Sequence, residues 1–277
     1  MTLASVMQLI TTRKPLPHRL GDFATLIIVL ATQQTASAMC NGIAVSLFSS
    51  TGSGHAGMDQ LCQNAVGVIE ALWPADSSPA SNDILRSSLE CHLSLTLMLL
   101  HCRRRDLLSF VRDFTMRADD SEARASLVQW VKKQGGQRAR AAAAHAGRLL
   151  ATLRRCPTGG FHEAIAVLLA ILLLWSYNQL LSEEPSFSPR QAVDEQGLLE
   201  RGSVIRLDGA KNTADIRAWC QNAQPGMKPY LQGVGSIVRP GAGVKIIELG
   251  QRLLKDMHVW GLGQGFASRL GKMQANM

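Results

Sequence analysis

A run of twelve uninterrupted apolar residues, Ala164 to Trp175, limits the folds open to this chain more than any other feature. Such a run must be hidden from water, either inside a protein core or inside a bilayer. A membrane-spanning helix needs roughly 20 consecutive apolar residues, so this run is too short to span. A second apolar segment, Phe23 to Leu30, is shorter and is soon followed by Gln33 and Gln34. We therefore expect buried core helices and no membrane segment.

Helical periodicity extends over most of the chain. From Leu61 to Leu72, apolar residues recur at i, i+4, i+7 and i+11, which places them on one helix face. The Ala-rich segment from Arg138 to Arg155 shows the same kind of stripe, and Pro157 ends it. The remaining expected helices are from about Ser81 to His101, Asp119 to Lys133, Phe161 to Leu181, Ala214 to Cys220, Val244 to His258 and Leu262 to Met273, with a short extended piece from Ser203 to Leu207.

These patterns predict an all-α fold, a single multi-helix array. The length of 277 residues is enough for one large domain with a sizeable core. We expect N-terminal helices in residues 1–80, a central helical core in 81–182, a linker in 183–203 and a C-terminal helical part in 204–277. The linker is expected because it holds two prolines and several polar residues.

The positive charge is concentrated in one stretch. The formal net charge of the chain is +8, and between Leu100 and Arg155 there are 13 Lys and Arg against five Asp and Glu, which is 13 − 5 = +8. A basic surface can attract nucleic acid, an anionic membrane or an acidic protein segment. Charge alone does not choose among these partners.

A cysteine and a histidine, both possible zinc ligands, are adjacent twice in the chain, at Cys91-His92 and at His101-Cys102. Zinc needs four converging ligands, and on one helix these two pairs would lie roughly 15 Å apart. The sequence also lacks Cys-x2–4-Cys and His-x3–5-His spacings. We expect no metal site, no cofactor and mostly buried, reduced cysteines in this chain.

Two further patterns suggest chemistry and are better explained by loops. Ser53, His55 and Asp59 lie close together, but in a Gly-rich stretch that we interpret as a turn. The glycines at 261, 263 and 265 follow a helix, whereas a dinucleotide-binding glycine motif follows a strand, so we expect a helix–helix corner. We therefore predict no catalytic residues and no enzyme.

The arginines remain as the candidate interaction residues. They fit either a solvated face or a surface for an acidic partner; direct DNA contact is disfavoured because few aromatic residues are interleaved for base stacking. The tryptophans are expected to anchor the core, because each buries a large area. The candidate interaction residues are Arg103, Arg104, Arg105, Arg140, Arg148, Arg154 and Arg155, and the candidate anchors are Trp130, Trp175, Trp219 and Trp260.

Five ordered segments in the last 190 or so residues carry a resemblance to a known family. They are Gln137 to Arg155 with Arg140, Ala141, His145 and Ala146 in an A-R-x-A-x-x-H-A pattern, Phe161 to Tyr177 with its L-W-x-Y end, Ile205 to Gly209 followed by Trp219, Leu231 to Ile237 with G-V-G, and Leu253 to Met273. Together they resemble the regulatory ("middle homology", xylanolytic-activator-type) region of fungal zinc-finger transcription factors.

The resemblance implies an all-α array, a nuclear location, control of transcription by RNA polymerase II, and contacts with other transcription-regulatory proteins. The family also implies an N-terminal zinc-finger pair or a binuclear zinc cluster, and this sequence contains neither. Zinc and DNA binding are therefore expected only in full-length members, whether upstream exons are missing here or the chain is a shortened paralogue.

The leading hypothesis is a regulatory and interaction module without catalysis. A second hypothesis is a small-molecule-sensing helical domain, with an apolar pocket lined by Met98, Met116 and several leucines. Two further hypotheses are an enzyme of unrecognised type and a membrane protein.

Overall fold

The computed structural model describes residues 3–12, 14, 20–40, 54–72, 84–102, 104–116, 121–182, 203–209, 213–222, 227–257 and 261–277. Most of them are helical, which confirms the predicted all-α class. The helices are α1 (Leu3–Thr11), α2 (Asp22–Cys40), α4 (Gly54–Ala71), α5 (Ile84–His101), α6 (Arg104–Met116), α7 (Ser121–Lys132), the 3-10 helix η1 (Lys133–Gly136), α8 (Gln137–Arg155), α9 (Phe161–Ser182), α10 (Thr213–Gln221), α11 (Ala242–Lys255) and α12 (Leu262–Ala275).

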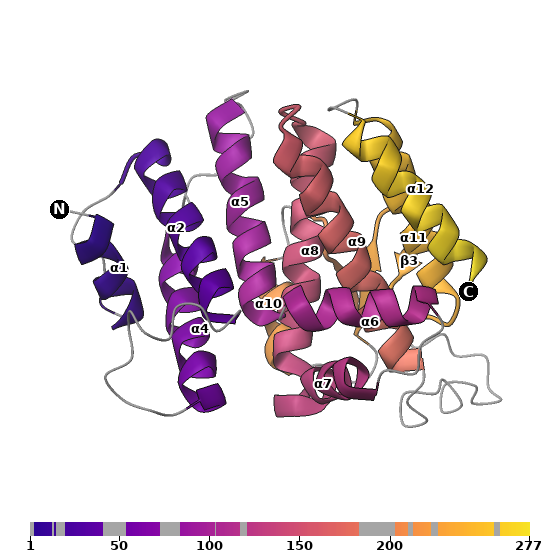
Figure 1. Ribbon diagram of the computed structural model, residues 1–277, viewed down its shortest axis with the longest axis horizontal. Helices are drawn as coiled ribbons and strands as arrows, with labels where there is room; N and C mark the ends of the chain where they lie inside the picture. The colour runs from indigo at the N-terminus through magenta and orange to yellow at the C-terminus, as the bar shows by residue number, and fades with distance from the viewer. Residues whose placement is uncertain are drawn as a thin grey trace.

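The long helices pack one after another across the molecule in the order α2, α5, α8, α9 and α11 (Figure 1). α1 and α4 lie against α2 at the N-terminal side, and α12 lies against α11 and α9 at the other side. α6 crosses α9, and α7 packs against α6 and α8. The inner helices α5, α8 and α9 are therefore each covered by a long helix on either side.

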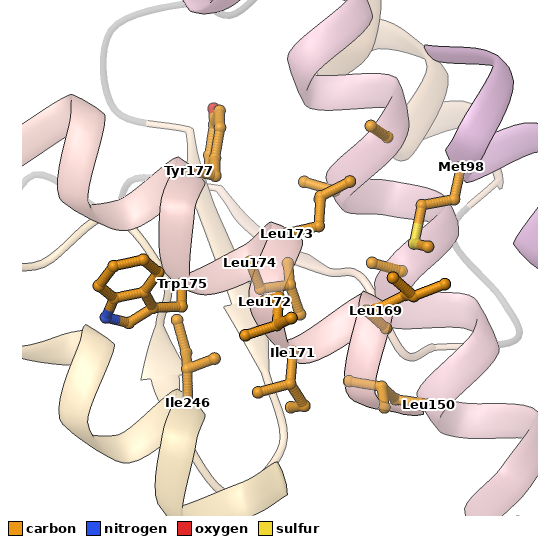
Figure 2. Close-up of a cluster of buried hydrophobic side chains, with 14 of the residues drawn as sticks. Met98, Leu150, Leu169, Ile171, Leu172, Leu173, Leu174, Trp175, Tyr177 and Ile246 are labelled. Carbon is orange, nitrogen blue, oxygen red and sulfur yellow. The ribbon is translucent and has the colours of Figure 1, made fainter. Parts of the chain in front are cut away.

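α9 forms the centre of the main apolar core. Figure 2 shows Met98 of α5 and Leu150 of α8 on one side of this helix, and Ile246 of α11 beside Trp175. Its 22 residues are long and apolar enough for a membrane span by composition, yet 83% of the most apolar window is buried within the protein. The expected core helix is confirmed, and it is longer than the twelve-residue run because Tyr177 and Leu180 continue the buried surface.

The first-turn acid of α9 holds the loop that leads into this helix. The buried carboxylate of Glu163 accepts hydrogen bonds from the backbone N of Thr158 at 2.7 Å and of Gly159 at 3.0 Å, and from the Thr158 hydroxyl at 2.7 Å. An acidic side chain in the first turn is also favourable, because the N-terminal end of a helix carries partial positive charge. These bonds explain how a charged group is tolerated beside the core.

α5 contributes buried residues to all three apolar clusters of the described residues. Leu93 and Leu97 pack with Val29 of α2 and Ile69 of α4, whereas Met98 belongs to the main cluster around α8 and α9. A helix with buried residues on more than one face must be covered on more than one side. The N-terminal helices and the central helices are therefore joined through α5.

Three short strands form a small sheet beside α8 and α10. β1 (Val204–Arg206) pairs in parallel with β2 (Lys228–Leu231), which pairs antiparallel with β3 (Gly235–Ser236). Gly233 and Gly235, at φ angles of 86° and 92°, make the reversal between β2 and β3 possible. The sequence predicted the extended piece at β1; β2 and β3 were missed because strands of four and two residues are too short to show alternation.

β1 leads into a close contact with α8. A Cβ atom at Gly147 would lie 2.6 Å from the Leu207 Cβ and 3.0 Å from the Leu207 carbonyl oxygen. Only glycine lets the backbone of α8 approach the residue after β1 this closely. This contact fixes the sheet against the middle of α8.

Several boundaries differ from the sequence predictions. The turn predicted around His55 and Asp59 is wrong, because both lie in α4, and a helix already formed is extended at little cost. Ser53 lies outside the described residues, as do residues 183–202 of the expected linker. α6 was not predicted, and it forms because Leu107 and Phe110, spaced three apart, both face the core.

The predicted helix–helix corner at the last glycine motif is confirmed. α11 ends at Lys255 and α12 begins at Leu262, with Gly261 at a φ angle of 70° before it. A Cβ atom at Gly263 would clash with the Leu254 and Met257 carbonyl oxygens. The glycine spacing therefore serves the close crossing of two helices.

Candidate interaction surface

The arginines of α8 do not form one exposed basic face. Arg140 is only 9% exposed, and its Nε and Nη2 donate to the carbonyl oxygen of Cys220 at 3.3 and 3.0 Å. The expectation that Arg140 contributes to an exposed partner-binding face is wrong, because α10 packs on that side of α8. Its guanidinium instead satisfies a carbonyl near the end of α10.

Arg154 is also engaged inside the molecule. Its Nη1 lies 3.4 Å from Asp208 Oδ2, in the turn after β1. The same carboxylate oxygen accepts a hydrogen bond from the backbone N of Gln232 at 2.8 Å, and Oδ1 lies 3.9 Å from Arg206 Nε. Burial lowers the pKa of Arg154, whereas Asp208 raises it. This network ties α8 to both β1 and the β2–β3 turn.

The other candidate arginines are more accessible. Arg148 is half-buried, and burial lowers its pKa while Glu90 raises it. Arg155 is exposed, and its Nε donates to the Ala151 carbonyl oxygen at 3.3 Å. Arg104 and Arg105 are exposed at the start of α6; Arg103 lies outside the described residues. Arg104 and Arg105 are therefore exposed at the start of α6, whereas Arg140 and Arg154 of α8 are engaged within the molecule.

Two of the four candidate tryptophans lie fully inside the core. Trp175 is 0% exposed and packs against Phe114 with ring centroids 4.7 Å apart, and Trp219 is 2% exposed. Trp130 is half-buried against the main core, and Trp260 lies outside the described residues. Trp175 and Trp219 are therefore buried, and each removes a large apolar area from water.

A small cavity lies where the end of α5 meets α6, α7 and the start of α8. Its volume is about 190 Å³. We call it the α7 cavity, and it is lined by His101, Asp106, Ser126, Leu127, Gln129, Trp130, Lys133 and Arg138. Four of these residues, at 126, 129, 130 and 133, are spaced three or four apart, so they lie on one side of the α7–η1 segment.

Side chains at this cavity cap the C-terminus of α5. Trp130 Nε1 donates to the His101 carbonyl oxygen at 2.7 Å, and Arg138 Nη2 donates to the Leu100 carbonyl oxygen at 3.0 Å. The last carbonyls of a helix have no partner within the helix, and a cation there also suits the helix dipole. Ser126 donates to Asp106 Oδ2 at 2.5 Å, which fixes the carboxylate in the lining. The cavity walls are thus held by hydrogen bonds between α5, α6, α7 and α8.

His101, which lines the cavity, stacks on the imidazole of His145. The rings of His101 and His145 are parallel within 9°, with centroids 5.7 Å apart. Burial and, to a smaller extent, the positive charge of Arg138 together lower the pKa of His101 to about 4. Burial, then His101 and Arg148, lower the pKa of His145 to about 3. Both imidazoles are therefore neutral at pH 7.

The Cys–His pairs considered for zinc take part in other contacts. His92 stacks on His162 with ring centroids 4.5 Å apart, while His101 stacks on His145. Burial raises the pKa of Cys91 and of Cys102 to about 12, which disfavours the thiolate that zinc requires. In the part of the chain that the structure describes, no three His, Cys, Asp or Glu side chains are grouped to hold a metal ion.

Met98 and Met116 do not line a common pocket. Met98 is fully buried in the main core, whereas Met116 is 73% exposed at the end of α6. The apolar ligand pocket expected between them is therefore wrong, because α6 turns Met116 outward while α5 turns Met98 inward. The α7 cavity is more polar than that prediction implied.

Comparison with known proteins gives one informative relationship. No protein-family model and no solved structure matches the chain. A protein named "Transcription factor" from Gibberella fujikuroi is 25% identical over 176 residues, which is 64% of this chain and 22% of that protein. This chain is similar to a fungal transcription factor. The similarity supports the relationship expected from the ordered segments, and the type of regulatory domain stays a prediction.

Proposed function

We propose that this chain is a regulatory and interaction domain of a fungal transcription factor, of the middle-homology type, that works in the nucleus through contacts with other proteins. The observation that carries this proposal is the similarity to a transcription factor over 64% of the chain. The chain spans 22% of that relative's length, so the activity of the whole protein includes regions that this chain does not match.

A non-catalytic role is supported by how the polar groups of the described residues are used. Buried Glu163 bonds to the loop before α9, Asp208 pairs with Arg154, and the Ser126 hydroxyl of the α7 cavity donates to the Asp106 carboxylate rather than to an imidazole. Groups engaged in structural bonds in this way do not form a nucleophile–base pair facing a substrate cleft. We infer control of RNA polymerase II transcription by protein contact, with DNA binding supplied by a zinc module outside this chain or by a partner.

The direct test is a tethered reporter. The chain is fused to a foreign DNA-binding domain and compared, in a fungal host, with that DNA-binding domain alone. We expect the fusion to change reporter transcription, in either direction. The matched control is the same fusion carrying Gly147→Ala, which disturbs the contact between α8 and β1 and should reduce the effect. A fusion that is folded and present in the nucleus yet leaves transcription unchanged would contradict the proposal.

A further inference from the structure

Two cations line the α7 cavity, and further cations lie next to its lining residues in the sequence. Lys133 and Arg138 line it, and exposed Lys132 is the next residue before Lys133. Exposed Arg104 and Arg105 immediately precede Asp106, which also lines it. Asp106 is the one carboxylate in the lining, and its Oδ2 already accepts a hydrogen bond from the Ser126 hydroxyl. The two lining cations outnumber the one lining carboxylate, and this local excess of positive charge favours a negatively charged group.

The volume sets an upper limit on what can enter. At about 190 Å³ the α7 cavity is smaller than the roughly 300–1,000 Å³ typical of pockets that enclose a small molecule. It has room for several waters, each of which occupies about 30 Å³ in the liquid, or for one amino-acid side chain. A side chain presented by another protein fits this space better than a complete metabolite.

The lining chemistry favours a peptide over nucleic acid. Leu127 and the half-buried ring of Trp130 offer apolar surface, Lys133 offers a cation, and Gln129 offers an amide that both donates and accepts. A peptide presents carboxylates, apolar side chains and backbone N–H groups together. A nucleic acid strand would bring phosphates against the Asp106 carboxylate, and Trp130 is the single large aromatic platform that the lining offers for bases.

We propose that the α7 cavity receives an acidic side chain, flanked by apolar residues, from an acidic segment of a partner protein. This inference rests on the proposed function and locates the contact at α7 and η1, in place of the internally bonded Arg140 and Arg154 of α8. The carboxylate lies between Lys133 and Arg138, and the flanking apolar residues pack on Trp130.

Gln129 provides the test, because its exposed side chain lies in the lining and can be replaced by a residue of either charge. The whole 277-residue chain is titrated against a fluorescein-labelled peptide in which Asp and Glu alternate with Leu, and binding is followed by fluorescence anisotropy. A matched peptide carries Asn and Gln in place of Asp and Glu. A short DNA duplex of similar charge is the third probe.

We expect Gln129→Lys to tighten acidic-peptide binding and Gln129→Glu to weaken it, each by roughly two- to fivefold in Kd, the effect of an exposed charge pair. Lys133→Glu reverses a charge and should weaken binding on the order of tenfold. Gln264→Glu, at an exposed position of α12, is the control and should leave Kd unchanged. Opposite effects at one position cannot arise from misfolding, and affinity should fall as salt is added.

Three results would overturn the proposal: equal binding of the neutral peptide, equal effects of Gln129→Glu and Gln264→Glu, or tighter binding of the duplex than of the acidic peptide. The tethered reporter separates this inference from the proposed function. An active reporter with no response at position 129 rejects the cavity alone. A silent reporter with charge-dependent peptide binding at position 129 rejects the transcriptional role alone.

Discussion

Arg154 Nη1 lies 3.4 Å from Asp208 Oδ2, so the last turn of α8 is joined by an ion pair to the turn after β1. The Asp208 side chain is 2% exposed, and its carboxylate also accepts the backbone N–H of Gln232. Three segments distant in sequence therefore meet at one buried carboxylate. A buried charge that loses its partner lowers the stability of the fold. Removing the Arg154 side chain therefore tests whether this network holds the sheet on α8.

Arg154→Ala should lower the free energy of unfolding by about 2 kcal/mol. Loss of one partner of a fully buried pair costs roughly 3–5 kcal/mol, and the effect is smaller here because the Arg154 side chain is 22% exposed and Arg206 lies near the same carboxylate. Arg155→Ala, at the exposed next residue, should change the free energy of unfolding by less than about 0.5 kcal/mol. Urea unfolding followed by circular dichroism measures both, and equal losses would contradict the network.

Two glycine-to-alanine changes in helices should have opposite signs. Gly147→Ala places a methyl group against Leu207 and should destabilise the protein by about 1–3 kcal/mol. Gly271→Ala in α12 meets no atom within 4 Å and should stabilise it by about 0.5–1 kcal/mol, because alanine favours helix. Thermal unfolding of the two variants tests this, and the packing of β1 on α8 would be refuted if Gly147→Ala were neutral.

Stability should fall as the pH drops below about 6.5. The folded-state pKa values of His101 and His145 are lowered to about 4 and about 3 from the ordinary value of 6.5, so the unfolded chain binds more protons between these limits. The stabilisation is complete above pH 6.5 and is lost as the pH falls toward the folded-state pKa values. By about pH 5 the loss should be on the order of 2 kcal/mol for each imidazole. Urea unfolding at a series of pH values measures it.

The variant His145→Gln isolates this contribution. Its unfolding free energy should depend less steeply on pH between about 7 and 5 than that of the unchanged chain, because one neutral, buried imidazole is removed. The slope is compared, and not the absolute stability, since the substitution also alters packing. Equal slopes for the variant and the unchanged chain would mean that His145 is not held neutral by burial.

The sequence was sufficient for the fold class and for the central helix. Trp175 and its apolar neighbours had to be buried whatever surrounded them. The apolar stripe of α8 predicted where this helix ends and placed its start one residue too late. The strands β2 and β3 were not predictable from periodicity, because their pairing depends on the Gly233 turn and on contacts distant in sequence.

The candidate surface was only partly predictable. A helical wheel places Arg140 and Arg154 opposite the apolar stripe of α8, but it cannot show that α10 and Asp208 occupy that side. The α7 cavity needed the ends of α5 and α7 to meet, which is a tertiary contact. The spacing of Ser126, Gln129, Trp130 and Lys133 was visible in the sequence, but it had no meaning until the α5 terminus was placed beside it.

The most direct measurement is reporter transcription by three tethered chains: Gln129→Lys, the unchanged chain and Gln129→Glu. If the chain regulates transcription by binding acidic partner segments, the transcriptional effect should be greatest for Gln129→Lys, intermediate for the unchanged chain and smallest for Gln129→Glu. A reporter that stays at the level of the DNA-binding domain alone for all three, with the fusions folded and nuclear, would contradict the central proposal.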